Sequence, residues 1–242
     1  MQRLRLLFLL SSGHLVTDMI SGALPVLLPA LKSEFSLSYT AVGVIILVSN
    51  LISSVIQPVF GIWSDRSAIL WLLPSGCLVA AAGMALVGVA PNYYLVLIAV
   101  ALSGLGSAAY HPEASKQAFL ISGEKKATAL SIYSVGGNIG HGLGPVIAAL
   151  LLDLSGRRGM AGFLILAFVI SYLLNRSLPA IQRLGGQNAA AQVDTDDSVS
   201  ENGTKKGVVF GLFLLLMVII MRSLVHIGLT NFIPLYVVEY LH

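Results

Sequence analysis

Charged residues and cysteines are scarce in this sequence. Only 10% of its 242 residues are charged and 56% are hydrophobic, and the mean hydropathy is +0.87. Soluble domains carry about 25% charged residues, so this composition excludes a soluble globular protein and indicates an integral membrane protein. The single cysteine, Cys77, has no second cysteine to pair with. A disulfide framework and a cysteine metal site are therefore excluded.

Enzyme motifs are missing as well. The chain has no His-Glu-x-x-His metal motif, no phosphate-binding glycine loop ahead of a lysine and no nucleophile elbow. The glycines of Gly140-His-Gly-Leu-Gly144 lie within an apolar run, with no strand predicted before them, so a dinucleotide site is not expected. We expect no enzymatic activity, no cofactor and no bound metal. The basic pI of about 9.1 concerns membrane orientation rather than nucleic acid, which is not an expected partner.

Long apolar runs are what the sequence has in abundance. Stretches of about 20 apolar residues are long enough to cross a bilayer as helices. The sequence predicts an all-α membrane protein with seven such spans, near residues 6–29, 41–63, 69–90, 93–113, 127–152, 160–178 and 208–238.

The spans fall into two membrane units. Residues 1–178 form a predicted six-helix bundle, and residues 179–207 are polar and low in complexity, as expected of a flexible linker. Residues 208–242 resemble the first span restarted, because Phe232-Ile-Pro-Leu-Tyr236 matches Ala23-Leu-Pro-Val-Leu27. We interpret this last span as the first helix of a truncated second bundle.

Basic residues indicate the orientation. With a cytoplasmic N-terminus, Lys32, Arg157 and Arg158 would lie outside. Most other basic residues, including those of the 179–207 linker, would then lie inside, as the positive-inside rule requires. We therefore expect a cytoplasmic N-terminus and a cytoplasmic linker.

Polar residues follow one face of four spans, which predicts a polar cavity between the first, second, fourth and fifth spans. Asp18 is the strongest functional candidate, because an unpaired carboxylate inside a bilayer is costly. His14, one turn away, is its expected partner. A proton-coupling or substrate role and a purely structural hydrogen-bonded pair both remain open. The candidate cavity residues are Asp18, His14, Asn50, Gln57, Tyr110, Asn138, His141, Arg222 and His226.

Two further pairs have competing interpretations. His111 and Glu113 flank Pro112 at the predicted end of the fourth span, where they either gate the cavity or form a solvated helix end. Arg222 and His226 lie one turn apart in the last span. Cavity lining is the favoured interpretation there, against a long side chain that reaches the membrane surface.

Glycines recur every four residues in the fifth span. Gly136, Gly140 and Gly144 share one helical face, and Pro145 follows directly. Small residues at this spacing let another membrane helix approach closely, and proline bends the helix. The sequence therefore predicts a close helix contact there.

Two motifs resemble a known family. The run Gly61-Ile-Trp-Ser-Asp65-Arg66, between the second and third spans, resembles the Gly-x-x-x-Asp-Arg loop signature of the major facilitator superfamily. Gly140-His-Gly-Leu-Gly144-Pro145 resembles the glycine-proline motif of its antiporters. Two further strings, in residues 13–25 and 103–114, are similar to the fosmidomycin resistance branch of drug exporters. The resemblance implies a latch role for Asp65 and Arg66.

The sequence also departs from that family. Ser67 and the apolar residues after it replace the usual glycine and basic residues of the loop signature, and Val100 stands where many drug exporters have an arginine. Ala148 and Ala149 replace two glycines of the antiporter motif. Seven predicted spans are fewer than the twelve of the complete superfamily fold, so the predicted fold is incomplete.

The resemblance implies a secondary active transporter in a bacterial plasma or inner membrane. It would export a small drug-like or metabolite molecule in exchange for protons, and the lipid bilayer would surround it. The alternative is a truncated, non-transporting membrane fragment or interaction partner. A half-transporter that needs a missing C-terminal half or a homodimer is the third possibility.

Overall fold

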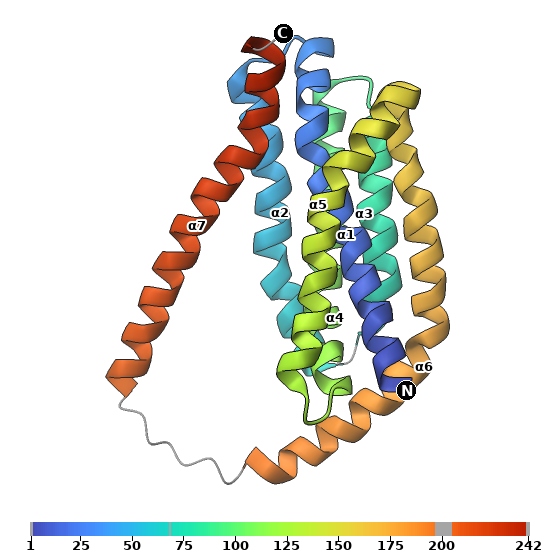
Figure 1. The fold of residues 1–242 in the computed structure, drawn as a ribbon, viewed down its shortest axis with the longest axis vertical. Coiled ribbons are helices and arrows are strands. Elements are labelled where there is room, and N and C mark those ends of the chain that lie inside the picture. The colour runs from blue at the N-terminus through green and yellow to red at the C-terminus, as the bar shows by residue number, and fades with distance from the viewer. Residues whose placement is uncertain (1, 68, 197–204, 241–242) are drawn as a thin grey trace. The chain divides into compact units, whose positions relative to one another are not determined.

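The computed structural model describes residues 2–67, 69–196 and 205–240. They belong to two compact units, residues 1–189 and 190–242, which are described separately (Figure 1). Every regular element among the described residues is helical, so the predicted all-α fold is confirmed.

Unit 1 begins with five membrane-length helices. Helices form here because a backbone in lipid must satisfy its own hydrogen bonds. Polar side chains set two of the starts: Ser38 accepts from the N–H of Ala41, and Asn92 accepts from that of Leu95. The helices are α1 (Gln2–Glu34), α2 (Tyr39–Arg66), α3 (Leu72–Val89), α4 (Tyr93–Ile121) and α5 (Lys126–Ser155).

A short 3-10 helix, η1 (Gly156–Ala161), leads into α6 (Gly162–Asp196), and α7 (Lys205–Tyr240) follows. Six segments of the described chain are long and apolar enough to cross a membrane. One of these segments, Lys126–Gln187, contains α5 and most of α6. The predicted six-helix bundle with one further helix is therefore confirmed.

Two helices run further than the sequence indicated. α4 passes through Pro112 and ends at Ile121, whereas the predicted span ended at residue 113. α6 continues to Asp196, so residues 179–196 of the predicted linker are helical in this structure. Alanines near the end of α6 favour helix by their intrinsic propensity. The linker residues 197–204 lie outside the described residues.

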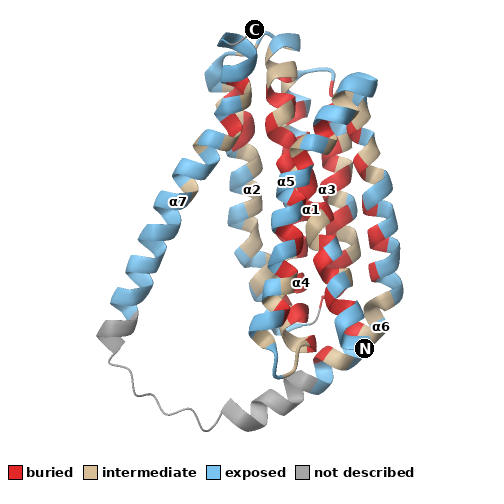
Figure 2. Ribbon diagram, viewed as in Figure 1, coloured by how far each residue is buried: buried red, intermediate tan, exposed pale blue. Residues whose placement is uncertain are grey.

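The core of unit 1 lies where α1 packs on α5 and where α4 packs on α2 and α3. Figure 2 shows buried residues concentrated on α1, α3 and α4. α6 joins through a stripe of buried residues three or four positions apart, from Phe163 through Ala167 and Ile170 to Leu174. Ser171 adds a hydrogen bond to the carbonyl of Pro74 on α3, at 2.8 Å.

The contact of α1 with α5 depends on glycine. A Cβ atom at Gly136, Gly140 or Gly144 would collide with the carbonyl oxygens of Ser11, Leu15 and Met19, in that order. Both sets of residues repeat every four positions, so one face of α5 lies directly on the backbone of α1. This geometry places the polar face of α5 beside that of α1.

One ion pair joins η1, which follows α5, to the C-terminal end of α1. Arg157 of η1 forms a two-pronged pair with Glu34 at the end of α1. The same guanidinium donates to the carbonyl oxygens of Val87, at 3.0 Å, and Ala90 at the end of α3. Arg157 therefore caps α3 and ties it to α1.

Candidate functional site: a histidine and aspartate cluster

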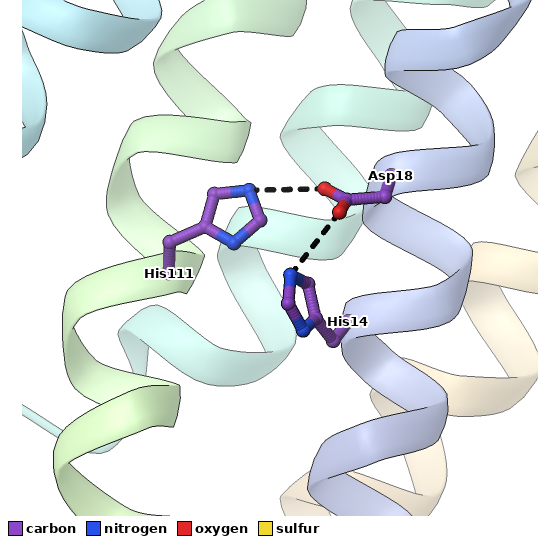
Figure 3. A group of neighbouring side chains, drawn as sticks. All are labelled: His14, Asp18 and His111. Atoms are coloured by element: carbon purple, nitrogen blue, oxygen red, sulfur yellow. Dashed lines mark ion pairs between the residues drawn. The ribbon is translucent and has the colours of Figure 1, made fainter. Parts of the chain in front are cut away.

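Asp18 of α1 lies at the centre of a polar cluster in unit 1. Its Oδ2 is 3.1 Å from Nε2 of His14, one turn earlier on α1, and its Oδ1 is 3.3 Å from Nε2 of His111 on α4. Figure 3 shows both imidazoles pointing at the two carboxylate oxygens. The expected His14 and Asp18 neighbours therefore meet, and α4 supplies a second imidazole from a distant part of the sequence.

Tyr133 of α5 fixes the ring of His14. Nδ1 of His14 lies 2.9 Å from the backbone oxygen of Tyr133. The two rings also stack, with centroids 4.1 Å apart. A carbonyl oxygen only accepts hydrogen bonds, so Nδ1 of His14 carries the hydrogen in this contact.

That assignment determines how many protons the pair holds. With hydrogen on Nδ1, a neutral His14 presents a bare Nε2 to Asp18. The 3.1 Å contact is then a hydrogen bond only if one more proton lies on Nε2 or on the carboxylate. A hydrogen bond between Nε2 of His14 and Asp18 therefore requires one proton more than a neutral His14 and an ionised Asp18 supply.

The hydrogen-bond partner of His111 is compatible with either a bare or a protonated Nε2. Its Nε2 lies 2.9 Å from Oγ of Ser107, as well as facing Asp18. A hydroxyl both donates and accepts, so Ser107 can donate to a bare nitrogen or accept from a protonated one. The His111 ring also lies edge-on to His14, with centroids 5.0 Å apart.

His141 of α5 is the most exposed member of the cluster. Its Nδ1 is 3.8 Å from Oδ2 of Asp18, and its side chain is 47% exposed, against 17% for Asp18. Gly137, one turn before it, leaves room for the cluster, because a Cβ there would lie 2.7 Å from Oδ2 of Asp18. The Asp18 side chain is thus largely shielded from solvent, and on one side it borders the exposed imidazole of His141.

Three of these groups are spaced closely enough for a metal ion. The ligand atoms of His14, Asp18 and His111 lie within 4.8 Å of one another. Each already has a protein partner at hydrogen-bond distance: His14 and His111 pair with Asp18, and Ser107 contacts His111. The same three side chains thus form a hydrogen-bonded cluster in this structure.

Tyr110 is placed differently from the other cavity candidates. Its side chain is fully buried, and its hydroxyl donates to the carbonyl of Leu10 at 2.6 Å. Gly13 makes room for the ring, since a Cβ there would collide with the tyrosine hydroxyl. Tyr110 thus packs α4 on α1 behind the cluster.

The remaining cavity candidates belong to α2, α5 and α7. Asn138 of α5 and Asn50 of α2 are exposed, and Gln57 of α2 is half-buried. The ion-pair partners of Asp18 among the described residues are the three histidines, and these amides are not among them. Arg222 and His226 belong to α7 in unit 2, so their relation to the cluster stays a prediction.

The loop motif lies at the end of α2. Asp65 and Arg66 are exposed in its last turn, and Gly61 faces Pro112 of α4, with 3.8 Å between the position of a glycine Cβ and the proline Cβ. Glu113 is wholly buried and accepts a hydrogen bond from Ser64 of α2. His111 and Glu113, grouped together from the sequence, therefore have different partners.

Sequence reasoning missed Tyr133, and it placed Ser107 on the polar face of the fourth span without predicting its contact with His111. Tyr133 acts through its backbone oxygen and ring face, neither of which has a sequence signal. Ser107 did have one, because it lies one turn before His111 on α4 and shares its face.

Comparison with known proteins identifies the class. The profile of the Major Facilitator Superfamily matches residues 10–242. The chain belongs to this superfamily.

Named relatives agree with this assignment. The chain is 39% identical to the Fosmidomycin resistance protein of Escherichia coli over 72% of its own length and 44% of that protein. It is 33% identical to the uncharacterized MFS-type transporter YfnC of Bacillus subtilis, over 81% of the chain and 48% of the relative. The chain therefore spans about half the length of these curated relatives.

A solved structure supports the fold alone. The tetrameric PepTSo2 crystal structure matches 99% of this chain and 50% of its own, with a TM-score of 0.55 and 18% identity. The helices described here therefore correspond to part of a twelve-helix superfamily fold, as the sequence predicted.

Proposed function

We propose that this chain is the N-terminal part of a proton-coupled exporter of small drug-like or metabolite molecules. The observation that carries the proposal is the 3.1 Å contact between Nε2 of His14 and Oδ2 of Asp18, where we place a shared proton. A buried group that can hold or release one proton is what coupling to a proton gradient requires. We propose no enzymatic role.

The cluster provides two electrostatic states. With the shared proton bound, Asp18 is neutral or paired with a charged imidazole, and the site holds no unbalanced charge. When the proton leaves, a bare carboxylate remains beside neutral His14, and an uncompensated charge in a shielded site is costly. A substrate that donates hydrogen bonds or carries positive charge would offset this cost, so proton and substrate would bind alternately.

The exposed polar residues form the proposed substrate surface. His141 is the exposed edge of the cluster, and Asn50, Gln57 and Asn138 add hydrogen-bonding groups on α2 and α5. The Escherichia coli relative is named for fosmidomycin resistance, and we extend drug export to this chain.

We further propose that Gly61, Asp65 and Arg66 form a conformational latch, with a gating role for His111 and Glu113. The membrane would be the bacterial plasma or inner membrane, with the N-terminus and residues 179–207 in the cytoplasm.

The half-length match supports a second candidate. A complete translocation path would need a C-terminal half or a second copy of the chain. A non-transporting fragment or interaction partner would keep the same bundle without a path. Co-expression with a C-terminal half tests this: restored drug export supports the transporter, and its absence under verified insertion of both parts supports the fragment.

The direct test is Asp18→Asn in the complete transporter. Asparagine keeps the size of the side chain and much of its hydrogen bonding but cannot release a proton. Vesicles with an imposed pH gradient should lose uphill transport of a fosmidomycin probe while keeping passive exchange. Asp153→Asn, which changes an exposed carboxylate of α5, is the matched control and should transport normally.

A chelator added to the same vesicles distinguishes proton-coupled transport from transport that requires a bound metal. Unchanged transport by the parent under chelation, together with loss of transport in Asp18→Asn, supports proton coupling. Equal proton-driven accumulation by Asp18→Asn and the parent would refute it.

A further inference from the structure

A second buried polar cluster joins α2 to α4. Glu113 is 0% exposed, and its two carboxylate oxygens accept from Oγ of Ser64 and from Nε2 of Gln117, the latter at 2.7 Å. Lys116 donates to the backbone oxygen of Ser64. We call Ser64, Glu113, Lys116 and Gln117 the α2 anchor. All of its members except Ser64 come from α4, so the end of α2 is held by α4.

The α2 anchor is tightly packed and sensitive to loss of one member. Oε1 of Gln117 is buried, and a Cβ at Gly185 of α6 would lie 2.7 Å from it. Gly185 therefore leaves the space that the amide of Gln117 occupies. Removing the Ser64 hydroxyl or the Glu113 carboxylate would leave a buried polar partner unsatisfied, which is costlier than an exposed loss.

α4 connects the α2 anchor to the Asp18 cluster through one short turn. His111 contacts Asp18 and Glu113 contacts Ser64, with only Pro112 between them. Side chains two residues apart on a helix point to nearly opposite sides. His111 therefore reaches α1 while Glu113 reaches α2. Proline also removes one helical hydrogen bond, so this turn is less restrained than its neighbours.

The α2 anchor in turn borders the loop motif at the end of α2. Ser64 directly precedes Asp65 and Arg66, and the N–H of Ser67 closes the helix on the carbonyl of Trp63 at 3.2 Å. A displacement of Ser64 therefore moves the last turn of α2 and the start of the loop.

We propose that Glu113 is a positioning residue that transmits a change at Asp18 to the end of α2. A change in the contact between Asp18 and His111 shifts the His111–Pro112–Glu113 turn, and Glu113 pulls on Ser64. The inference rests on the proposed proton role of Asp18, and goes beyond it by naming the path to the loop motif. It depends on hydrogen bonding by Glu113 rather than on its charge.

Thiol labelling in detergent tests the path without any transport assay. Cys77 is fully buried, so the parent chain should react slowly. Ser67→Cys adds an exposed thiol at the end of α2, which serves as the reporter. Asp18→Asn should change the labelling rate of this reporter thiol by about fivefold or more, the range expected for coupled sites.

Variants of the α2 anchor then test whether the effect of Asp18→Asn reaches Ser67 through Glu113 and Ser64. Glu113→Ala and Ser64→Ala should each abolish the effect of Asp18→Asn on labelling. Glu113→Gln should retain it, because glutamine can donate to Ser64 and accept from Gln117. Ser122→Ala is the matched control: its hydroxyl bonds the carbonyl of Phe119 at the end of α4, at 2.6 Å and away from the Pro112 turn, so the effect should persist.

A second reporter excludes a general loosening of the fold. Ser131→Cys places an exposed thiol on α5, at a serine that also bonds a carbonyl four residues earlier. Its labelling rate should be the same in every variant. If Glu113→Ala fails to insert, Ser64→Ala still decides the question.

The outcomes separate this inference from the proposed function. No effect of Asp18→Asn on the Ser67→Cys reporter, or an effect that survives Ser64→Ala, overturns the inference even if proton-driven export depends on Asp18. Coupling that disappears only in Ser64→Ala and Glu113→Ala supports it even if Asp18→Asn transports normally.

Discussion

Gly137 of α5 faces Asp18 of α1 so closely that a Cβ at the glycine would lie 2.7 Å from the carboxylate oxygen. The same Cβ would also meet the ring of His14. The contact of His14 with Asp18 therefore depends on the absence of a side chain at this position of the neighbouring helix.

Gly137→Ala should damage the cluster without removing any of its polar groups. Overpacking of this kind costs about 1–3 kcal/mol, and here the displaced atoms belong to His14 and Asp18. Proton-driven export by the complete transporter should fall, together with the melting temperature. Gly142→Ala is the control, because nothing lies within 4 Å of a Cβ there. Equal transport by the two variants would contradict the prediction.

Gly144→Leu should separate α5 from α1. A leucine cannot fit where a Cβ alone collides with the carbonyl oxygen of Met19. Export should be abolished or become leaky while membrane insertion persists, and thermal unfolding should begin earlier. Gly142→Leu, on the open side of the helix, should behave like the parent. Unchanged transport in Gly144→Leu would remove the glycine face from the mechanism.

Arg157→Ala should destabilise unit 1. It leaves the carboxylate of Glu34 and the carbonyls of Val87 and Ala90 without this partner, at a cost of about 1–3 kcal/mol. Glu34→Gln should cost less than about 1 kcal/mol, because Glu34 is half exposed.

A thiol-reactive fluorophore measures this unfolding directly, because buried Cys77 becomes reactive only when the fold opens. Arg158→Ala, which changes the exposed neighbour, should leave the melting temperature unchanged. A loss of stability in Arg158→Ala as large as in Arg157→Ala would show that net charge, and not the cap, matters.

The proposed orientation is open to a labelling test in intact cells. Arg158→Cys and Gly186→Cys each place a thiol at an exposed position, one in η1 and one in α6. A membrane-impermeant maleimide should label the Arg158→Cys variant and leave the Gly186→Cys variant unlabelled. The reverse pattern would invert the topology.

The sequence predicted the helices and the contact of His14 with Asp18 because both depend on local periodicity. Four residues on one helix place two side chains together whatever else the chain does. His111 was harder, since Pro112 was interpreted as the end of the span, whereas a buried α4 tolerates proline and continues to Ile121.

Contacts between distant segments left little trace in the sequence. The bond of Ser64 with Glu113 joins residues 49 positions apart, and the acceptor for His14 is a backbone oxygen of Tyr133. The long α6 was missed for another reason: its last turns have helix-forming alanines, but they lack the apolar run used to find membrane spans.

The four-residue repeat on both α1 and α5 leaves their alignment ambiguous. Sliding α5 by four residues, about 6 Å, would set Gly140, Gly144 and Ala148 against the same three carbonyls, and all are small. The same slide would replace Gly137 by His141 opposite Asp18, where no imidazole fits. The polar cluster is thus also the feature that selects a single register for this helix pair during assembly.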